Sequence, residues 1–352
     1  MSTIIAEDVA RLLACGAGLW NPLRGASLFI TGGTGFFGIW LLETLLAANR
    51  ELSLGMRVAV LSRDPAGFAA KAPHLAVDPA LRFVTGDVRD FPTPHGDISH
   101  VIHAATEASA SLNAADPQTM FDVCAEGTRR VLALAVEKRA ARMLFTSSGA
   151  VYGRQPPGLA NIPEDFPGGP DPLNAANAYA EGKRAAEMLC GLAVRSSGLP
   201  VTIARCFAFV GPHLPLEAHF AIGNFIRDAI AGGPIRIAGD GTAWRSFLYA
   251  SDLIEWLVTI LGRGAVGRAY NVGGSEAVSI RQLAERVASV AGEVFPERPQ
   301  PVVVQAGKPV SGGPAERYVP CCLRAERECG LTVATPLGEA IRRTMLFHSG
   351  CE

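Results

Sequence analysis

A tyrosine and a lysine four residues apart carry the most specific chemical signal in this sequence. Tyr179 and Lys183 stand in the segment YAEGK, and this spacing puts both side chains on one face of a helix. A neighbouring ammonium group favours the phenolate and lowers the pKa of a tyrosine from its ordinary value of about 10. A tyrosine tuned in this way can take or return a hydroxyl proton while a hydride leaves or reaches the carbon.

A serine upstream completes this group. Ser148 stands in the segment FTSSGAVYG, where an apolar run ends. We expect it to share the substrate hydroxyl with Tyr179 and to orient it, and Ser147 is the weaker candidate by register. The sequence therefore predicts Ser148, Tyr179 and Lys183 as catalytic residues, with Ser148 also touching the substrate.

A glycine-rich turn precedes this group by more than 100 residues. The segment TGGTGFFG follows the first apolar run and opens a leucine-rich helix, with Gly32, Gly35 and Gly38 spaced by three. Glycine there permits a tight turn, a close approach of backbone N–H groups to a pyrophosphate, and close packing of helix on strand. The expected cofactor contacts in this turn are Gly32, Thr34, Gly35, Phe36, Phe37 and Gly38.

The end of the second apolar run indicates which dinucleotide binds. An NAD enzyme places an acid there to hold the ribose 2′-hydroxyl. Here Ser62 has that position and Arg63 follows, which suits a 2′-phosphate, while Asp64 comes one to two residues late. NADP is therefore slightly favoured over NAD. Tyr179 and Lys183 are also expected to contact the cofactor, whose nicotinamide charge acts together with the Lys183 ammonium group to lower the pKa of Tyr179. The remaining expected contacts follow the third and fourth runs: Asp87, Val88, Ala104, Ala105 and Thr106.

Short apolar runs alternate with helix-period segments over the first 200 residues. The runs lie at 27–31, 57–61, 81–85, 99–103, 142–146 and 200–204. This alternation predicts an α/β fold with a doubly wound parallel sheet whose strands are covered on both faces. We expect a helical extension over 1–24, a dinucleotide-binding domain over 25–204 to which 238–262 returns, and a smaller mixed substrate-binding lobe from 205–237 and 263–352.

Composition excludes several other classes of protein. Apolar residues make up 49% and charged residues 18%, which excludes a disordered chain. A net charge of −1 gives no electrostatic case for nucleic acid. No run is long enough for a membrane span, and the eight cysteines show no zinc-ligand spacing. We expect a cytoplasmic protein with no metal site and no membrane or nucleic-acid partner.

The motifs TGGTGFFG, GDV, HAAT, SSGAVYG, YAEGK and GDGTAWRSF together resemble the extended short-chain dehydrogenase/reductase superfamily, in its NAD(P)-dependent nucleotide-sugar epimerase/dehydratase branch. The resemblance implies a Rossmann domain, a C-terminal lobe that binds a nucleoside diphosphate sugar, and a homodimer built from the helices around 118–137 and 175–195. It also implies that Arg245 clamps the diphosphate and that Asn224 contacts the nucleotide. Guanidinium suits phosphate because it binds in a bidentate way.

The departures from the family pattern narrow the chemistry. Dehydratases of the family carry Asp-Glu, and its decarboxylases a glutamate, where this chain has Gly149 and Ala150. The resemblance therefore favours 4-epimerisation or reduction of a 4-keto sugar. A dehydratase or decarboxylase would need another acid, such as His213 or Glu217.

Two further readings stay open. Ala208 and Cys124 replace asparagines of the family pattern that bear on the pose of the sugar nucleotide. A reductase of a non-sugar alcohol is therefore one alternative. The other is a non-catalytic protein that senses a dinucleotide, although such proteins commonly lose the tyrosine or the lysine.

Overall fold

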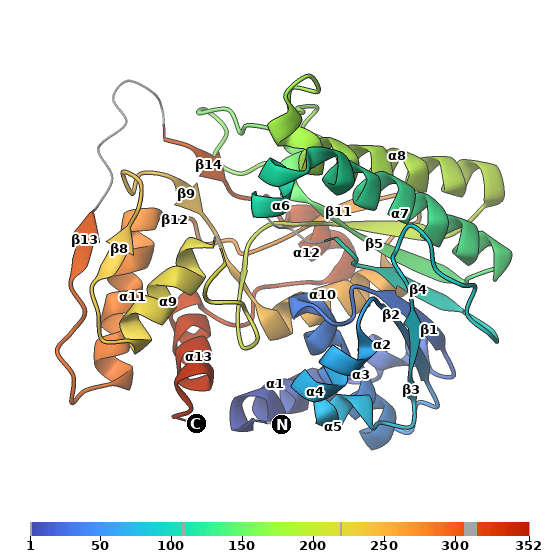
Figure 1. The fold of residues 1–352 in the computed structure, drawn as a ribbon, viewed down its shortest axis with the longest axis horizontal. Helices are drawn as coiled ribbons and strands as arrows, with labels where there is room; N and C mark the ends of the chain where they lie inside the picture. Colours follow the sequence, from blue (N-terminus) through green and yellow to red (C-terminus); the bar gives the residue numbers. More distant parts are fainter. Residues whose placement is uncertain (1, 107–109, 219, 306–314, 352) are drawn as a thin grey trace.

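A seven-stranded parallel sheet forms the centre of the computed structural model, which describes residues 2–106, 110–218, 220–305 and 315–351 (Figure 1). The strand order is β11-β6-β5-β4-β1-β2-β3. The sheet therefore winds in opposite directions from the β1–β4 pair, the point where ligands bind in such folds. Its strands are β1 Ser27–Thr31, β2 Arg57–Ser62, β3 Leu81–Thr85, β4 His100–His103, β5 Arg142–Ser148, β6 Val201–Cys206 and β11 Ala269–Val272.

Helices cover both faces of the sheet, as the continuous apolar runs predict. Strands β1 and β4 are buried at every residue. On one face α10 packs against α3 and against β5 and β6, and on the other face α7 and α8 pack against each other and against β4 and β5. These helices are α3 Phe36–Glu51, α7 Pro117–Glu137, α8 Ala178–Ser197 and α10 Ala250–Arg263.

All six apolar runs form strands of the sheet, and the α/β fold is confirmed. The seventh strand, β11, lies in the part of the chain that the sequence division assigns to the lobe, so the boundary at residue 263 is wrong there. Its four residues carry too short an apolar run to stand out, and they are buried because β6 pairs with them and α12 packs on them. The N-terminal extension is also not one helix, since Gly16 at φ +83° separates α1 from α2.

The remaining elements fall into two groups. Beside the sheet lie α1 Thr3–Ala14, α2 Ala17–Trp20, η1 Asn21–Leu23, α4 Pro65–Lys71, α5 Pro73–Ala76, α6 Ala110–Ala115, η2 Gly149–Tyr152, η3 Ala175–Asn177 and α12 Leu323–Cys329. A second hydrophobic core joins the helices of the lobe, α9, α11 and α13. The lobe and its connections contain β7 Phe209–Val210, α9 Ala221–Ile230, β8 Ile235–Ile237, β9 Trp244–Arg245, β10 Leu248–Tyr249, β12 Val278–Ser279, α11 Ile280–Val294, β13 Val303–Gln305, β14 Arg317–Tyr318 and α13 Leu337–Ser349.

Helix α1 connects the sheet domain with the lobe (Figure 1). The Arg11 guanidinium donates to the fully buried carboxylate of Asp252 on α10 at 2.7 Å. One turn earlier, Asp8 accepts from the Tyr249 hydroxyl at 2.7 Å and pairs with Arg343 on α13 at 3.2 Å. Burial of these charges is tolerated because each of them is paired.

Arg11→Met is expected to destabilise the protein by about 2 kcal/mol, because it leaves the buried Asp252 carboxylate without its cation while keeping an apolar stem. Urea unfolding of the purified chain measures this. Arg286→Met is the matched control, since Arg286 forms an exposed pair with Glu276 that is expected to contribute less than about 1 kcal/mol. Equal losses in the two variants would contradict a stabilising role for the Arg11–Asp252 pair.

Candidate active site

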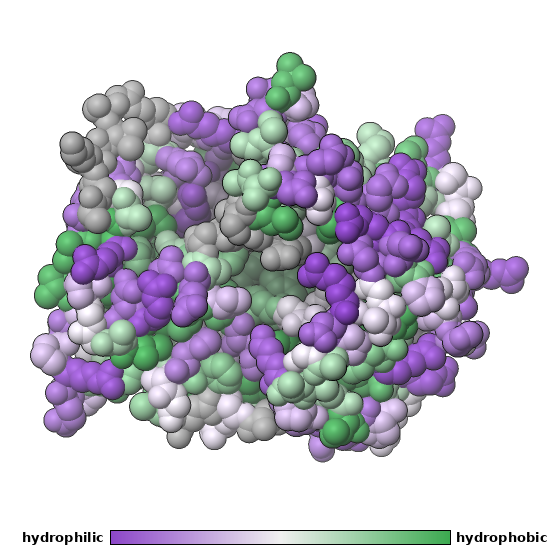
Figure 2. Space-filling view, in the orientation of Figure 1, coloured by the Kyte–Doolittle hydropathy of each residue, from purple (hydrophilic) through white to green (hydrophobic). Residues whose placement is uncertain are grey.

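The predicted catalytic residues meet at the carboxyl edge of the sheet. Ser148 is the last residue of β5, and Tyr179 and Lys183 lie in the first two turns of α8, which packs against β5. Figure 2 shows that the molecule is hollowed near the centre of one face, between the part that carries α9 and the sheet domain. Residues far apart in the sequence thus share one region of the fold.

Lys183 is anchored to the sheet. Its side chain is only 3% exposed, and its ammonium group donates to the backbone carbonyl of Thr146 at 2.7 Å. The nitrogen lies 4.9 Å from the ring centroid of Phe145 and 6.0 Å from that of Tyr179. Burial lowers the pKa of Lys183. The ammonium group therefore lies beside the tyrosine, as the YAEGK spacing predicts.

The pKa of Tyr179 is raised in the protein alone. Burial is the largest influence and raises it above the ordinary value, while the Ser148 hydroxyl acts in the opposite direction. The lowered pKa expected from the sequence requires the positive charge of a bound nicotinamide in addition to Lys183, and it stays a prediction for the cofactor-bound protein. Tyr179 is consequently a phenol at neutral pH and can donate its proton.

The two serines at the end of β5 have different partners. The Ser148 oxygen accepts from the backbone N–H of Ala150 at 3.1 Å, and its hydroxyl opposes the rise in the pKa of Tyr179. Ser147 instead donates to Glu187 at 2.6 Å, and Glu187 also binds Arg205. Alternation along the strand thus sends Ser147 into a buried structural network and leaves Ser148 beside the tyrosine.

Tyr318 also belongs to this group, although no sequence motif identifies it. Its hydroxyl lies 3.5 Å from the Ser148 hydroxyl, and its ring lies 4.6 Å from that of Phe207. A Cβ atom added at Gly149 would approach both the Tyr318 oxygen and the Phe207 ring to 2.7 Å. The space that a side chain at position 149 would need is therefore filled by these two aromatic residues.

The glycine turn has the geometry that a pyrophosphate requires. Gly32 has φ +73°, and a Cβ atom there would lie 2.5 Å from the carbonyl of Ala104. At Gly38 a Cβ atom would lie 2.2 Å from the backbone of Gly33, so helix and strand pack closely only with glycine. Gly35 caps α3 without a side-chain hydrogen bond, which leaves this helix N-terminus suited to an anion. Thr34, Phe36 and Phe37 lie in the same turn and are partly exposed.

The fourth strand closes the other side of this turn. The Thr31 hydroxyl contacts the His103 ring at 2.7 Å and accepts from the backbone N–H of Ala105 at 3.1 Å. Burial lowers the pKa of His103 to about 3, so the ring is neutral and structural. Ala104, Ala105 and Thr106 follow it, partly exposed and directly beside Gly32. They occupy the place at which the sequence predicts a cofactor contact.

One arginine follows each of the strands β2 and β3, namely Arg63 after β2 and Arg89 after β3. Ser62 is buried and accepts from the backbone N–H of Asp64, and Asp64 itself caps α4 by accepting from Gly67. Asp87 binds Arg89 at 2.7 Å, and this guanidinium, with a smaller contribution from Arg63, lowers the pKa of Asp87. Asp64 is thus used by its own loop, while positive charge surrounds Asp87. Val88 is buried and packs toward Gly127 of α7.

The two predicted substrate residues, Arg245 and Asn224, have different surroundings. The Arg245 guanidinium lies 5.8 Å from the ring centroid of Tyr318 and pairs with Glu316 at 2.8 Å, so it adjoins the catalytic group. Asn224 on α9 directs its amide nitrogen at the carbonyls of Leu216 and Ala218, at 2.9 and 3.0 Å. Its side chain therefore holds a loop of the lobe, and a nucleotide contact by Asn224 stays a prediction.

The two substitute acids considered for elimination chemistry have different surroundings. His213 packs against the rings of Trp40 and Phe347, and burial lowers its pKa to about 4. It is a neutral imidazole between α3 and α13. Glu217 is exposed on the loop that precedes α9.

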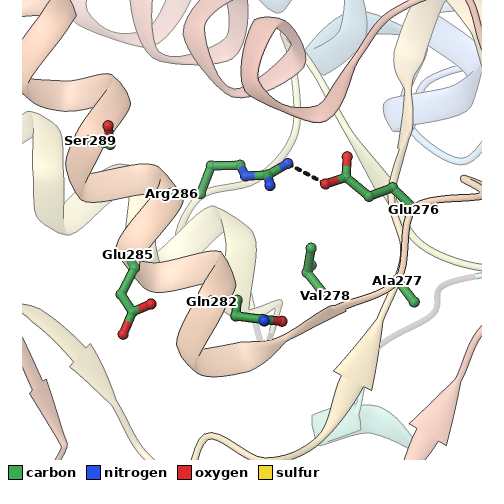
Figure 3. Close-up of a pocket in the computed structure, with 7 residues that line it drawn as sticks. All are labelled: Glu276, Ala277, Val278, Gln282, Glu285, Arg286 and Ser289. Atoms are coloured by element: carbon green, nitrogen blue, oxygen red, sulfur yellow. Dashed lines mark hydrogen bonds and ion pairs between the residues drawn. The ribbon is translucent and has the colours of Figure 1, made fainter.

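Other kinds of site find no support. In the described ranges, no group of three or more histidine, cysteine or acidic residues is arranged to hold a metal, and none of the described helices is long and apolar enough to cross a membrane. A groove of about 440 Å³ lies between α11 and residues 276–278. Figure 3 shows that Arg286 points at Glu276, with which it pairs, while Glu285 of the same groove is exposed.

Comparison with known proteins agrees with this geometry. UDP-glucuronic acid decarboxylase 1 of Arabidopsis thaliana is 32% identical over 263 residues, which cover 75% of this chain and 58% of that protein. UDP-glucuronic acid decarboxylase 3 of the same plant is 29% identical over 76% of this chain and 77% of its own length. This chain spans about three fifths of the length of the first two curated relatives it matches.

Solved structures share the whole architecture. The dTDP-glucose 4,6-dehydratase DesIV of Streptomyces venezuelae, with NAD and TYD bound, superposes with a TM-score of 0.77 at 25% identity, over 92% of this chain and 97% of that one. The UDP-glucuronic acid 4-epimerase of Bacillus cereus shares the fold, with a TM-score of 0.74 at 20% identity, over 93% and 100%. The model of the NAD-dependent epimerase/dehydratase family matches residues 28–273. Because that match runs from β1 through β11 and so spans the entire sheet, this chain belongs to the NAD-dependent epimerase/dehydratase family.

Proposed function

We propose that this protein is an NAD(P)-dependent oxidoreductase or epimerase that acts on a nucleoside diphosphate sugar. Hydride transfer takes place at one sugar carbon, as 4-epimerisation or as reduction of a 4-keto sugar. Ser148, Tyr179 and Lys183 are its catalytic residues. The proposal is supported by the names of its relatives, which act on UDP-glucuronic acid or dTDP-glucose.

The aromatic filling at Gly149 is the observation that carries this choice of chemistry. Elimination of water or of CO2 next to the oxidised carbon needs a further acid or base beside Ser148. Positions 149 and 150 are Gly and Ala, and Phe207 and Tyr318 occupy the space where a side chain at 149 would stand. A Ser–Tyr–Lys group without such an acid suffices for oxidation and reduction at one carbon.

The residues present fit a dinucleotide. Gly32 and Gly38 leave room that any Cβ atom would fill, and the uncapped N-terminus of α3 suits the pyrophosphate. The residues proposed to hold the cofactor are Gly32, Thr34, Gly35, Phe36, Phe37, Gly38, Ser62, Arg63, Asp87, Val88, Ala104, Ala105, Thr106, Tyr179 and Lys183. When bound, the cofactor supplies or accepts the hydride.

The chain's own residues manage the proton. In the reducing direction Tyr179 donates its phenolic proton to the oxygen of the keto sugar, because its raised pKa keeps it protonated at neutral pH. In the oxidising direction Tyr179 first loses its phenolic proton to solvent, and the resulting phenolate takes the proton of the sugar hydroxyl. Lys183 stabilises the phenolate by charge, and Ser148 donates a hydrogen bond to the same substrate oxygen. Arg245 is proposed to bind the diphosphate after exchanging its Glu316 partner.

A second candidate is a 4,6-dehydratase or decarboxylase that uses a non-standard acid. The identity of up to 32% to UDP-glucuronic acid decarboxylases favours it. It requires a proton donor or acceptor beyond Ser148 and Tyr179, and His213 packs against Trp40 and Phe347 instead. Product masses separate the candidates, since dehydration removes water, decarboxylation removes CO2, and epimerisation leaves the mass unchanged.

Tyr179→Phe is expected to lower turnover by at least about 100-fold, because the proton donor is lost while the ring remains. The assay offers UDP-, dTDP-, GDP- and CDP-sugars with NAD(P)H or NAD(P)⁺ and follows the products by mass spectrometry. Cofactor affinity should stay close to that of the unmodified protein. Tyr270→Phe, which removes a hydroxyl held by Ala265 and Glu328, is the control. Turnover that survives in Tyr179→Phe contradicts the assignment, and no turnover of any sugar by the unmodified protein favours a non-sugar substrate or a sensor.

We further propose that NADP is preferred over NAD. Ser62 offers a hydroxyl at the end of β2, and Arg63 follows it. Arg89 lies in the loop after the neighbouring strand β3, paired with Asp87. A 2′-phosphate binds well to guanidinium groups. Asp64, the acid nearest the expected ribose position, accepts from Gly67 instead.

Arg63→Ala is expected to weaken NADPH binding about tenfold, because one charge-assisted contact is lost, and to leave NADH binding within about twofold. Fluorescence titration of the two reduced cofactors measures both constants. Arg286→Ala, a change at the distant exposed pair, should alter neither. An equal loss for NADH and NADPH would refute a 2′-phosphate contact.

A homodimer through α7 and α8 is also proposed. These two helices pack together on one face of the sheet, and α8 exposes Met188 (65%) and Leu192 (52%), while α7 exposes Val136 (40%). Exposed apolar side chains gathered on one surface suit an interface. The double variant Met188→Glu, Leu192→Glu is expected to elute as a monomer in size-exclusion chromatography with light scattering. A dimer that survives this change places the interface elsewhere.

The eight cysteines are all free thiols, which supports the proposed cytoplasmic location. Six of them are buried or half-buried, and Cys15 and Cys351 are exposed. Exposed thiols persist in a reducing compartment.

A further inference from the structure

Tyr318 reaches the catalytic group from a distant part of the chain. It lies on β14, which pairs with β9 of the lobe, 170 residues beyond Ser148. Burial raises the pKa of its phenol to about 12, so it is protonated throughout the ordinary pH range. A protonated hydroxyl has one hydrogen to donate and can also accept.

The Tyr318 and Ser148 hydroxyls lie 3.5 Å apart, and either oxygen can be the donor of the hydrogen bond between them. The Ser148 oxygen already accepts from the backbone N–H of Ala150 at 3.1 Å. When Tyr318 donates, both acceptor sites of Ser148 are used, and Ser148 keeps its own hydrogen for Tyr179 or for the substrate oxygen.

We propose that Tyr318 is a positioning residue that directs the Ser148 hydrogen toward Tyr179 and the substrate, through the chain Tyr318 O–H to Ser148 and Ser148 O–H to Tyr179 or the substrate oxygen. No covalent bond changes in Tyr318 and no proton leaves it. The contact of 3.5 Å shortens when the substrate closes the site, as catalytic hydrogen bonds commonly do. This inference rests on the proposed function of Ser148 and Tyr179.

The absence of a side chain at Gly149 makes this chain of hydrogen bonds possible. Any Cβ atom at Gly149 would stand 2.7 Å from the Tyr318 oxygen and from the Phe207 ring. The Phe207 ring lies 4.6 Å from the Tyr318 ring, and the Arg245 guanidinium lies 5.8 Å from the centroid of the Tyr318 ring. These two contacts fix where the Tyr318 hydroxyl lies. The same glycine that removes an acid from the site thus admits the hydroxyl of Tyr318.

The groups that face the two phenols come from several elements. Tyr179 faces Lys183 on its own helix, Ser148 on β5, Cys124 on α7, Cys206 on β6 and Tyr318 on β14. Tyr318 faces, besides Ser148, the Cys206 thiol and the Arg245 guanidinium. Burial raises the pKa of Cys124 and raises that of Cys206 to about 12, so both thiols are neutral. Lys183 and Arg245 are therefore the charged groups of this set at neutral pH.

Tyr318→Phe tests the proposal, since it removes one oxygen and keeps the ring on Phe207. We expect kcat to fall about tenfold with KM changed by less than about twofold. In the oxidising direction the apparent pKa of the acidic limb of the kcat profile should rise, because a weaker Ser148 hydrogen bond stabilises the Tyr179 phenolate less. Tyr270→Phe, a matched loss of a tyrosine hydroxyl outside the site, should leave this limb in place.

A double variant tests whether Tyr318 acts through Ser148. If it does, Ser148→Ala with Tyr318→Phe turns over within about twofold of Ser148→Ala alone, because the second change then has nothing left to orient. Losses that multiply would overturn the proposal, as would a raised KM with unchanged kcat, which marks Tyr318 as a direct substrate contact. The proposed function fails if the unmodified protein does not turn over or if the Tyr179→Phe variant does. The role of Tyr318 is tested only when the unmodified protein turns over and Tyr179→Phe does not, so the two failures are distinguishable.

Discussion

Buried hydrogen bonds join the two elements that carry the proposed chemistry, and the bond made by Lys183 lies nearest to Tyr179. The buried Lys183 ammonium group donates to the carbonyl of Thr146 at 2.7 Å and so ties α8 to the end of β5. Removing an ammonium group from water is costly unless its donors are used. The Thr146 carbonyl and the face of the Phe145 ring meet part of that need. The distance between Ser148 on the strand and Tyr179 on the helix depends on this contact, and the sheet and helices α7 and α10 keep its two ends in place.

The carboxyl edge of a parallel sheet makes such a contact possible. Each strand ends there, and the turns after β1, β4 and β5 bring glycine, small and hydroxyl side chains into one region. Gly32 illustrates the constraint, since its turn touches the backbone of Ala104 so closely that no other residue fits. The lobe contributes from the other side, through Arg245 and Tyr318. Helix α1 pins the two parts together through Asp8 and Arg11, which bind α13 and α10.

Desolvation sets the acid–base character of the site. Tyr179 and Tyr318 are half-buried and Cys206 is buried, and desolvation raises the pKa of each of their phenol or thiol groups. Each of these groups is thus neutral at physiological pH, and positive charge comes from Lys183 and Arg245. In the protein alone this arrangement suits proton donation to a carbonyl oxygen. Deprotonation of Tyr179 becomes favourable only when further positive charge enters the site.

Local patterns in the sequence were enough to predict six strands of the sheet, one catalytic helix face and the glycine turn. Six apolar runs gave six strands, because a buried parallel strand needs a continuous apolar segment. The YAEGK spacing put Tyr179 and Lys183 on one helix face, and the glycine spacing defined the turn before α3, because these geometries follow from neighbouring residues. Tertiary structure alone decided the rest. The strand β11 was missed because its burial comes from β6, α10 and α12, and burial by other elements sets the pKa of Tyr179 in the protein alone. Tyr318 had no motif, since its place beside Ser148 arises only when a segment 170 residues away folds over Gly149.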